Sequence, residues 1–327
     1  MNSFLCEIEK FESGSEAYEE KFYSTGFTEL DKALNGGFTA GFHALGAISS
    51  LGKTTFALQM SENLAVQGIP VIIFSLEMRQ EHLVAKAISR NMYLSFLEQS
   101  YSDVSDVNYP KSYGELMNPL IRKHLTVAEQ NLLQKAIERT KKCTNGIDLV
   151  SNNATVPLTI DGILEYIENY INKTNKRPFI IIDYLQFIRP SERVVNRSDK
   201  QNMDYIVSSL VSCAQRFRIP ILAISSLSRA AYDRPIDLAA FKESGMIEYS
   251  ADIVLGMQLK GVGESGFDVN EAKLKTPREI EVVILKGRAS AAGSKIEYRF
   301  NSKYNYFEEI KTPCFKSSVI DLERRSR

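Results

Sequence analysis

The segment from Ala47 to Thr55, AISSLGKTT, constrains the fold of this chain more than any other. It follows the apolar run Phe42 to Leu45 and opens the amphipathic stretch Thr54 to Val66, so it lies where a strand turns into a helix. A Gly-Lys-Thr loop in that setting is typical of phosphate-binding loops, because its backbone N–H groups and the helix N-terminus point at the phosphates. Lys53 would reach the β- and γ-phosphates, and the Thr54 hydroxyl can ligate Mg²⁺. The sequence therefore predicts a nucleotide site.

One position of this loop departs from the usual pattern, which has a glycine five residues before the Gly-Lys pair. Ala47 stands at that position, with Gly46 one step earlier. A Gly-Lys-Thr turn that binds no ligand is therefore the alternative. If the loop binds a nucleotide, the contacts are expected from Ala47, Ser49, Ser50, Leu51, Gly52, Lys53, Thr54 and Thr55.

Six apolar runs with a near-continuous Val, Ile and Leu content indicate a parallel sheet that is covered on both faces. These runs are Phe42–Leu45, Pro70–Ser75, Phe179–Asp183, Pro220–Ser225, Asp252–Gln258 and Glu279–Lys286. The segment 295–310, KIEYRFNSKYNYFEEI, alternates around a polar Asn-Ser-Lys turn and predicts a β-hairpin whose aromatic residues pack in the sheet rather than stack on bases. We therefore expect an α/β fold: a mostly parallel, twisted sheet with helices on both faces and a C-terminal β-hairpin.

The stretch 92–176 is interpreted as a helical insertion whose helices pack on the sheet. Thr126 and Glu129 form a capping box that predicts one helix, and apolar residues at helical spacing after Thr159 predict another. Residues 1–22 are acidic and weakly patterned, which indicates an arm outside the core. We expect one domain over residues 23–311 and a C-terminal tail over 312–327.

The overall charge gives no sign of nucleic-acid binding, because 40 Lys and Arg residues balance 40 Asp and Glu residues. The region 186–234 differs, since it holds eight basic residues against four acidic ones. Such a surplus is compatible with a solvated face as well as with a nucleic-acid contact.

The cysteines and the N-terminus indicate a cytoplasmic protein. Cys6, Cys143, Cys213 and Cys314 are far apart, so neither a disulfide framework nor a zinc site is expected, and a reducing compartment fits best. The N-terminal segment carries acidic residues where a signal peptide needs cations. The longest apolar runs have the length of strands, so no membrane segment is expected.

Two carboxylates follow predicted strands. Asp183 ends the run Phe179–Ile182, and Glu77 follows the run Val71–Phe74. The carboxyl ends of parallel strands line one crevice, so both side chains can converge with Lys53 around one phosphate chain. A carboxylate there can accept a proton from an attacking water. The alternative for Asp183 is an aspartate that only caps a strand end.

Six segments together resemble a known family in their order and spacing. They are TGFTELDKALNGGF, AISSLGKTTFALQMSENLA, VIIFSLEM, IIIDYLQFI, KESGMIEYSADIV and ILKGRAS. Together they resemble the ATPase domain of DnaB-like replicative helicases, a RecA-like fold, over roughly residues 24–310. FSLEM and IDYLQ are specific in combination with this form of the loop, and alanine is common in that family at the position of Ala47.

The resemblance implies a role for each matching residue. Lys53 and Thr54 would hold phosphate and Mg²⁺, Glu77 would activate water, and Asp183 would hold the water shell of the metal. Lys286 and Arg288 would reach into the ATP site of a neighbouring subunit, although surface charge on the last strand is the alternative.

The resemblance also implies partners. They are single-stranded DNA, further copies of the chain in a hexameric ring, and a primase or helicase loader. The loops Arg189–Lys200 and Arg229–Lys242 match those that line the DNA pore. The DNA contacts are expected from Arg189, Arg193, Arg197, Lys200, Arg229 and Lys242.

Two departures from the family pattern qualify these expectations. Ser226 replaces a glutamine whose amide senses the γ-phosphate, and its side chain is shorter by roughly 2.5 Å of reach, which predicts weaker coupling between hydrolysis and DNA movement. Only about 22 residues precede Thr25, where family members carry a helical collar and a linker helix. A ring of this chain would then depend on the acidic arm, a nucleotide, DNA or a partner.

Three functional interpretations remain open at this point. The leading one is an ATP-driven DNA helicase domain that moves along one strand. The second is a RecA-like DNA-dependent ATPase that binds or remodels DNA complexes without processive unwinding, which Ser226 and the short N-terminus favour. The third is a non-catalytic interaction module. The residues that argue against it are the intact Lys53, Thr54, Glu77, Asp183 and Arg288.

Overall fold

The computed structural model describes residues 4–13, 20–99, 110–151, 158–191, 198–227, 232–241, 245–288, 290 and 292–311. Within these residues one nine-stranded sheet has the order β3-β2-β4-β5-β1-β6-β7-β8-β9. Its strands are β1 (Gly41–Ala47), β2 (Val71–Ser75), β3 (Ile147–Ser151), β4 (Phe179–Asp183), β5 (Pro220–Ser226), β6 (Ile253–Leu259), β7 (Arg278–Gly287), β8 (Lys295–Asn301) and β9 (Tyr306–Glu309).

The six strands from β3 to β6 in the sheet order are parallel. β2 and β4 read VIIFS and FIIID, and every residue of both strands is buried. Burial on both faces is what such continuous apolar runs predict. The α/β fold with a mostly parallel sheet is thus confirmed.

The last three strands are antiparallel and form the predicted hairpin. In β8 buried and more exposed residues alternate, as one covered face requires. The rings of Phe300 and Phe307 stack at 4.2 Å, and Tyr298 meets Phe307 edge-on at 6.2 Å. These aromatic residues pack in the core, as predicted, rather than stand ready to stack on bases.

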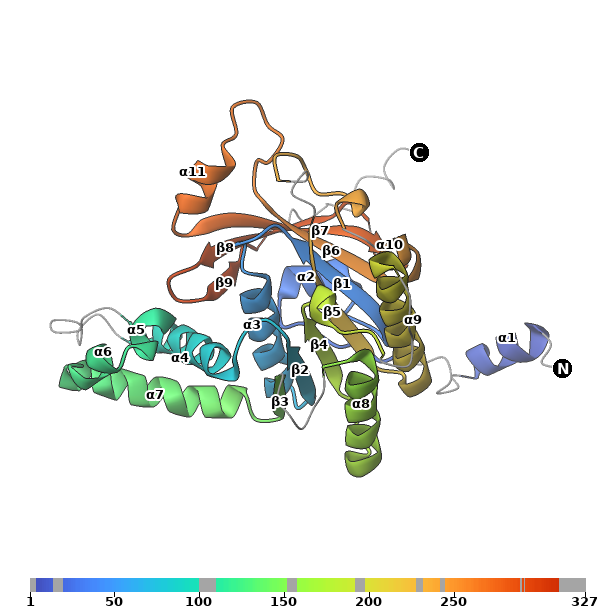
Figure 1. Cartoon of the computed structure of the whole chain (residues 1–327), viewed down its shortest axis with the longest axis horizontal. Helices are drawn as coiled ribbons and strands as arrows, with labels where there is room; N and C mark the ends of the chain where they lie inside the picture. The colour runs from blue at the N-terminus through green and yellow to red at the C-terminus, as the bar shows by residue number, and fades with distance from the viewer. Residues whose placement is uncertain are drawn as a thin grey trace, which may run out of the picture.

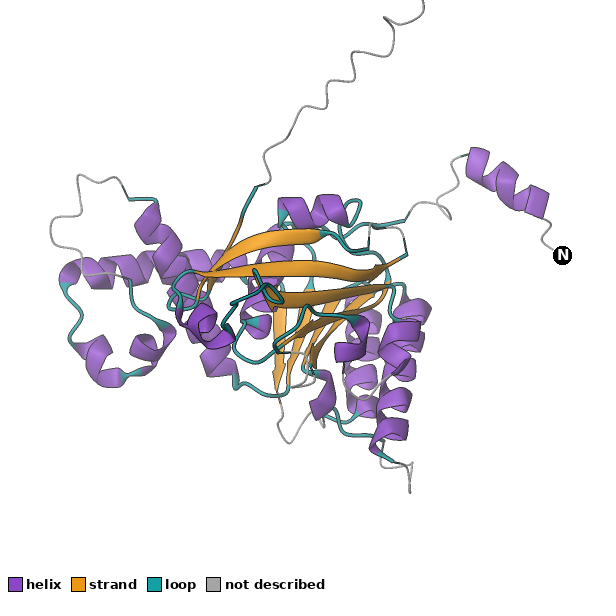
Figure 2. Cartoon of the chain, turned by 90° about the horizontal axis from the view of Figure 1, so that it is seen from above, coloured by secondary structure: helices purple, strands orange, loops and turns teal. Residues whose placement is uncertain are grey.

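Helices lie on both faces of the sheet (Figure 1). α3 (Lys53–Val66) covers one face, and α8 (Ile160–Thr174) and α9 (Asp199–Phe217) cover the other. α3 has buried residues on every turn, because it lies between the sheet and neighbouring helices. Figure 2 shows the sheet from above, with helices on its two sides. The remaining helices are α1 (Phe4–Glu12), α2 (Thr28–Ala33), α4 (Gln80–Leu97), α5 (Tyr113–Met117), α6 (Pro119–Lys123), α7 (Val127–Cys143), α10 (Gly245–Ser250) and α11 (Val269–Leu274).

The prediction that 92–176 is a helical insertion packed on the sheet is correct for α8, whose Ile160, Ile163 and Ile167 join the main core, and wrong in two respects. The segment Ile147–Ser151 is the edge strand β3, which pairs with β2. The helices α4 to α7 extend to the left of the sheet in Figure 1, and α4, α5 and α7 share a second apolar cluster of Met92, Leu116, Leu132 and Ala136. Both expected helix starts are nevertheless present, since Thr126 forms a capping box with Glu129 and the Thr159 hydroxyl caps α8.

The N-terminal residues include a helix that the sequence analysis did not predict. α1 lies apart from the sheet in Figure 1, and its apolar residues Phe4, Leu5 and Ile8 are exposed. Among the described helices, none is long and apolar enough to cross a membrane.

The hairpin also holds the N-terminus of α2. α2 has no capping side chain of its own, since its N-cap is Phe27. The carboxylate of Glu309 in β9 accepts the backbone N–H groups of Glu29 and Leu30 at 2.9 and 3.1 Å. A carboxylate at this place satisfies otherwise unpaired N–H groups, and it joins segments 280 residues apart.

Candidate nucleotide-binding site

The loop between β1 and α3 has the backbone that its sequence predicts. Ser50 and Gly52 have positive φ angles of 72° and 88°. A Cβ on Gly52 would lie 2.8 Å from the ring of Phe300, so both the backbone and the space require glycine. The Nζ of Lys53 donates to the carbonyl of Ala47 at 2.8 Å, which closes the loop on itself. The N-terminus of α3 therefore opens onto a tight turn of backbone.

Asp183 and Glu77 leave neighbouring strands beside this loop. Ser75 pairs with Asp183 in the parallel ladder, and the N–H of Leu76 donates to the Asp183 carbonyl at 2.7 Å. The Thr54 hydroxyl donates to Asp183 Oδ2 at 2.6 Å. Glu77 follows at the exposed rim. The structure thus brings Lys53, Thr54, Glu77 and Asp183 together at the carboxyl edge of the sheet.

The electrostatics of these groups are coupled. Burial raises the pKa of Asp183 to about 6, the hydrogen bond from Thr54 lowers it, and Glu77 raises it further. Burial lowers the pKa of Lys53, while Asp183, Glu77 and Tyr232 oppose that shift. The charge states of Lys53 and Asp183 therefore depend on each other. Binding of a cation or a phosphate at this place would shift both.

The donor set fits a divalent cation. Asp183 Oδ1 is buried and has no hydrogen-bond partner in the described part of the chain. An unpaired buried carboxylate oxygen is costly unless it meets a cation or water. With the Thr54 hydroxyl 2.6 Å from Oδ2, the residues present are those that hold Mg²⁺ beside a phosphate-binding loop.

Sequence reasoning missed four further side chains at this site. Arg278 Nη1 donates to the carbonyl of Ser50 at 2.7 Å, and Lys86 Nζ donates to the Thr55 hydroxyl at 3.2 Å. Tyr232 contacts Ser49, and Gln186 contacts the end of β5. Tyr232 and Arg278 come from segments far away in the chain, so no local pattern could have identified them. Gln186 lies in the IDYLQ segment, where its neighbourhood to Asp183 was the available signal.

Ser226 lies next to the loop. It pairs with Ala47 in the ladder between β5 and β1, and its N–H donates to Gln186 Oε1 at 3.2 Å. Gln186 Nε2 also donates to the buried Ser225 hydroxyl at 2.9 Å. The amide of Gln186 thus holds the end of β5 at Ser226.

Lys286 and Arg288 lie at the opposite end of the strands from the loop. Because β7 runs antiparallel to β6, its end lies beside the start of β6, and the hydrogen bonds through Asp252 place Arg288 level with Phe42, about 17 Å along β1 from Ala47. Lys286 Nζ donates to the carbonyls of Glu248 and Tyr249, and Arg288 Nε lies 2.8 Å from Asp252 Oδ1 with 73% of its side chain exposed. Neither cation reaches this chain's own loop.

Only two of the six residues predicted to contact DNA lie among the described residues. Arg189, after β4, and Lys200, at the start of α9, are exposed. The backbone of Arg189 bonds to that of Leu158 and Ile160 at the carboxyl edge of the sheet. Arg193, Arg197, Arg229 and Lys242 lie outside the described residues.

The chain combines a mostly parallel sheet, this loop, two carboxylates at adjacent strand ends and a C-terminal hairpin. This combination defines a RecA-like P-loop ATPase fold. A family model for the DnaB-like helicase C terminal domain matches residues 23–151 and 104–309. The chain belongs to this family.

Relatives in sequence agree with the family model. The chain is 27% identical over 290 residues to a probable replicative DNA helicase of Trieres chinensis, which covers 87% of the chain and 56% of that protein. It is 28% identical over 296 residues to the replicative DNA helicase DnaC of Bacillus subtilis, covering 88% of the chain and 56% of that protein. The chain therefore spans about half the length of these relatives.

Two solved structures have the same fold. One is described as an ATPase domain and matches with a TM-score of 0.74 at 21% identity, over 95% of this chain and 100% of that one. The other is a DnaB-like replicative helicase, described with its interactions with primase. It matches with a TM-score of 0.74 at 22% identity, over 95% of this chain and 68% of that one.

Proposed function

We propose that this chain is the motor domain of an ATP-dependent DNA helicase, which hydrolyses ATP in a ring and moves along single-stranded DNA. The observation that carries the proposal is the meeting of Lys53, Thr54, Glu77 and Asp183 at one rim of the sheet, beside a loop built for phosphate. Family membership supports the same conclusion.

The residues divide the chemistry among them. Backbone N–H groups from Ser49 to Thr55 and the ammonium of Lys53 bind the triphosphate. Thr54 and Asp183 would hold Mg²⁺, which when bound neutralises charge on the phosphates. Glu77, exposed at the rim, orients the attacking water and accepts its proton.

The placement of Arg288 supports a ring. A cation about 17 Å along the strands from its own loop can complete a nucleotide site only in another copy. Lys286 lies beside it and would serve the same site. A head-to-tail interface that repeats this contact closes into a ring, for which we propose the hexamer.

DNA and protein partners follow from the same proposal. Arg189, Lys200 and the basic residues between and after them would contact the phosphates of single-stranded DNA in the pore. A primase is a proposed partner, because a structural relative is described with one. The proposed location is the cytoplasm, and the proposed boundaries are an arm over 1–22, the ATPase domain over 23–311 and a tail over 312–327.

One observation favours a second candidate function. Ser226 lacks the amide that couples the γ-phosphate to DNA in this family, so a DNA-dependent ATPase that remodels complexes without processive unwinding is the alternative.

A forked duplex with one labelled strand separates these functions. The wild-type chain should displace the strand with ATP and Mg²⁺, and Lys53→Ala should lower both hydrolysis and displacement on the order of a hundredfold or more, because the phosphates lose their buried cation. Lys135→Ala, on the exposed face of α7, is the matched control and should leave both unchanged. Hydrolysis without displacement would favour the remodelling ATPase. Neither activity in the wild type would leave only a non-catalytic module.

A further inference from the structure

The described residues after β5 return to the phosphate-binding loop. Leu227 and Phe241 form an isolated antiparallel bridge directly after Ser226. Both side chains crowd Gly46 of β1, where an added Cβ would lie 2.5 Å from the ring of Phe241. The two ends of the segment 227–241 are therefore fixed against the strand that leads into the loop.

Within that segment, Tyr232 contacts the loop itself. Its hydroxyl lies 3.3 Å from the Ser49 hydroxyl and accepts the Ser49 N–H at 3.5 Å. The ammonium of Lys273 in α11 lies 5.1 Å from the centre of the Tyr232 ring. The hydroxyl of Tyr232 is thus directed at the loop, while the Lys273 ammonium makes a cation–π contact with its ring.

The phenol also lies in the field of Lys53. The hydrogen bond with Ser49 lowers the pKa of Tyr232, and Lys273 and Lys53 lower it further. Lys53 is the side chain that reaches the β- and γ-phosphates in a loop of this kind. Tyr232 therefore lies close enough to Lys53 to act on its charge, as Glu77 and Asp183 do.

We propose that Tyr232 is a γ-phosphate contact of this ATPase, in which its hydroxyl supplies the donor that Ser226 is too short to provide. The assignment rests on the proposed ATPase function. Without a γ-phosphate, the hydroxyl keeps its contacts with Ser49; with one, it donates to a charged phosphate oxygen, which is a stronger acceptor than a serine hydroxyl. Tyr232 would then make the chain distinguish ATP from ADP.

The test is a pair of affinities measured by calorimetry on the full chain with Mg²⁺. AMP-PNP carries a γ-phosphate and ADP does not, so the ratio of their dissociation constants isolates that group. Tyr232→Phe keeps the ring under Lys273 and removes only the hydroxyl. It should lower the preference for AMP-PNP over ADP by about tenfold, the factor expected for one hydrogen bond to a charged group. Affinity for ADP should stay within about twofold.

Tyr170→Phe is the matched control, because Tyr170 is half-buried in α8 on another part of the sheet, and it should leave the ratio unchanged. A residue that only tethers the loop would change both affinities equally. A ratio in Tyr232→Phe within about twofold of the wild-type ratio overturns the assignment, even if the wild type hydrolyses ATP and unwinds DNA. A wild-type chain that binds neither nucleotide would instead refute the proposed function itself.

Discussion

At the scale of single residues, His43 is a buried group whose charge state is tied to folding. Its side chain lies in β1 with no exposed surface, and its Nε2–H donates to the Thr39 carbonyl at 2.8 Å. Its Nδ1 has no partner among the described residues. Burial lowers the pKa of His43 to about 4, against opposing effects of Thr39 and Asp252.

This shift predicts a loss of stability in acid. The unfolded chain takes up a proton at its ordinary pKa near 6.5, while the folded chain resists until about pH 4, so stability falls as pH falls between these values. The expected cost at pH 5 relative to pH 7.5 is about 2 kcal/mol from this residue. Urea unfolding at both pH values measures it, and His43→Gln should remove it because a glutamine amide can still donate to Thr39 but does not titrate.

The effect of His43 must be measured against the His43→Gln variant, because Asp183 changes the stability in the opposite direction as pH falls. Its pKa is raised to about 6, so its contribution to stability grows as pH falls from about 6 towards 4. His124→Gln, an exposed histidine in the same experiment, should keep the wild-type pH dependence. An unchanged pH dependence in His43→Gln would contradict the account of this residue.

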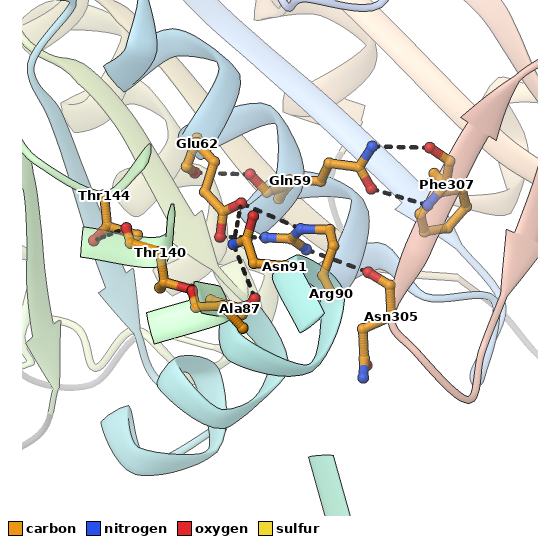
Figure 3. A network of polar contacts seen from close by, with 12 residues as sticks. Gln59, Glu62, Ala87, Arg90, Asn91, Thr140, Thr144, Asn305 and Phe307 are labelled. Atoms are coloured by element: carbon orange, nitrogen blue, oxygen red, sulfur yellow. Dashed lines mark hydrogen bonds and ion pairs between the residues drawn. The ribbon is translucent and has the colours of Figure 1, made fainter. Parts of the chain in front are cut away.

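At the scale of elements, α3 and α4 are joined by a buried ion pair. Arg90 is 1% exposed, and its guanidinium meets both carboxylate oxygens of Glu62, with Nη2–Oε1 at 2.5 Å and Nε–Oε2 at 3.2 Å. Arg90 also donates to the Asn305 carbonyl in the turn of the hairpin. Figure 3 shows the three residues facing one another. The pair therefore links two helices to the last strands of the sheet.

Arg90→Met should destabilise the chain by about 3–5 kcal/mol, because it leaves the Glu62 carboxylate buried without a counter-charge. Guanidinium unfolding gives the free energy of each variant. Lys260→Ala removes an exposed ion pair, in which the Lys260 ammonium lies 2.8 Å from the Glu297 carboxylate. This variant should lose less than about 1 kcal/mol. Equal losses in the two variants would show that burial does not determine the effect.

The elements also show what the sequence could predict. Strands buried on both faces, such as β2 and β4, are visible in their own composition. β3 is not, because IDLVS is a mostly half-buried edge strand directly after a long helix, and only its pairing with β2 makes it a strand. The separate packing of α4, α5 and α7 depends on which apolar faces meet, which periodicity does not specify.

The same limit applies to the candidate site. Lys53, Thr54, Glu77 and Asp183 could be predicted because each is next to a strand or loop with its own pattern, and strand register brings them together. Tyr232 and Arg278 lie 183 and 228 residues from their partners in the loop. Contacts of that kind arise from the folded chain and leave no local signal. The roles of the site residues remain predictions.

At the scale of the whole molecule, the nucleotide loop and Arg288 lie at opposite ends of the strands of one sheet. Under the proposed function, one copy would present half of a site at each end of the strands, and two copies in a head-to-tail contact would assemble a complete one. Arg288 is suited to this because it is mostly exposed and its pair with Asp252 is a surface pair, which costs little to break.

Mixing two inactive variants tests this central claim most directly. Lys53→Ala and Arg288→Ala should each abolish ATP hydrolysis when assayed alone with single-stranded DNA. An equimolar mixture should regain about a quarter of the wild-type rate, since half of the loops are intact and half of their neighbours supply the arginine. A mixture as inactive as its components, or an Arg288→Ala chain as active as the wild type, would contradict the account.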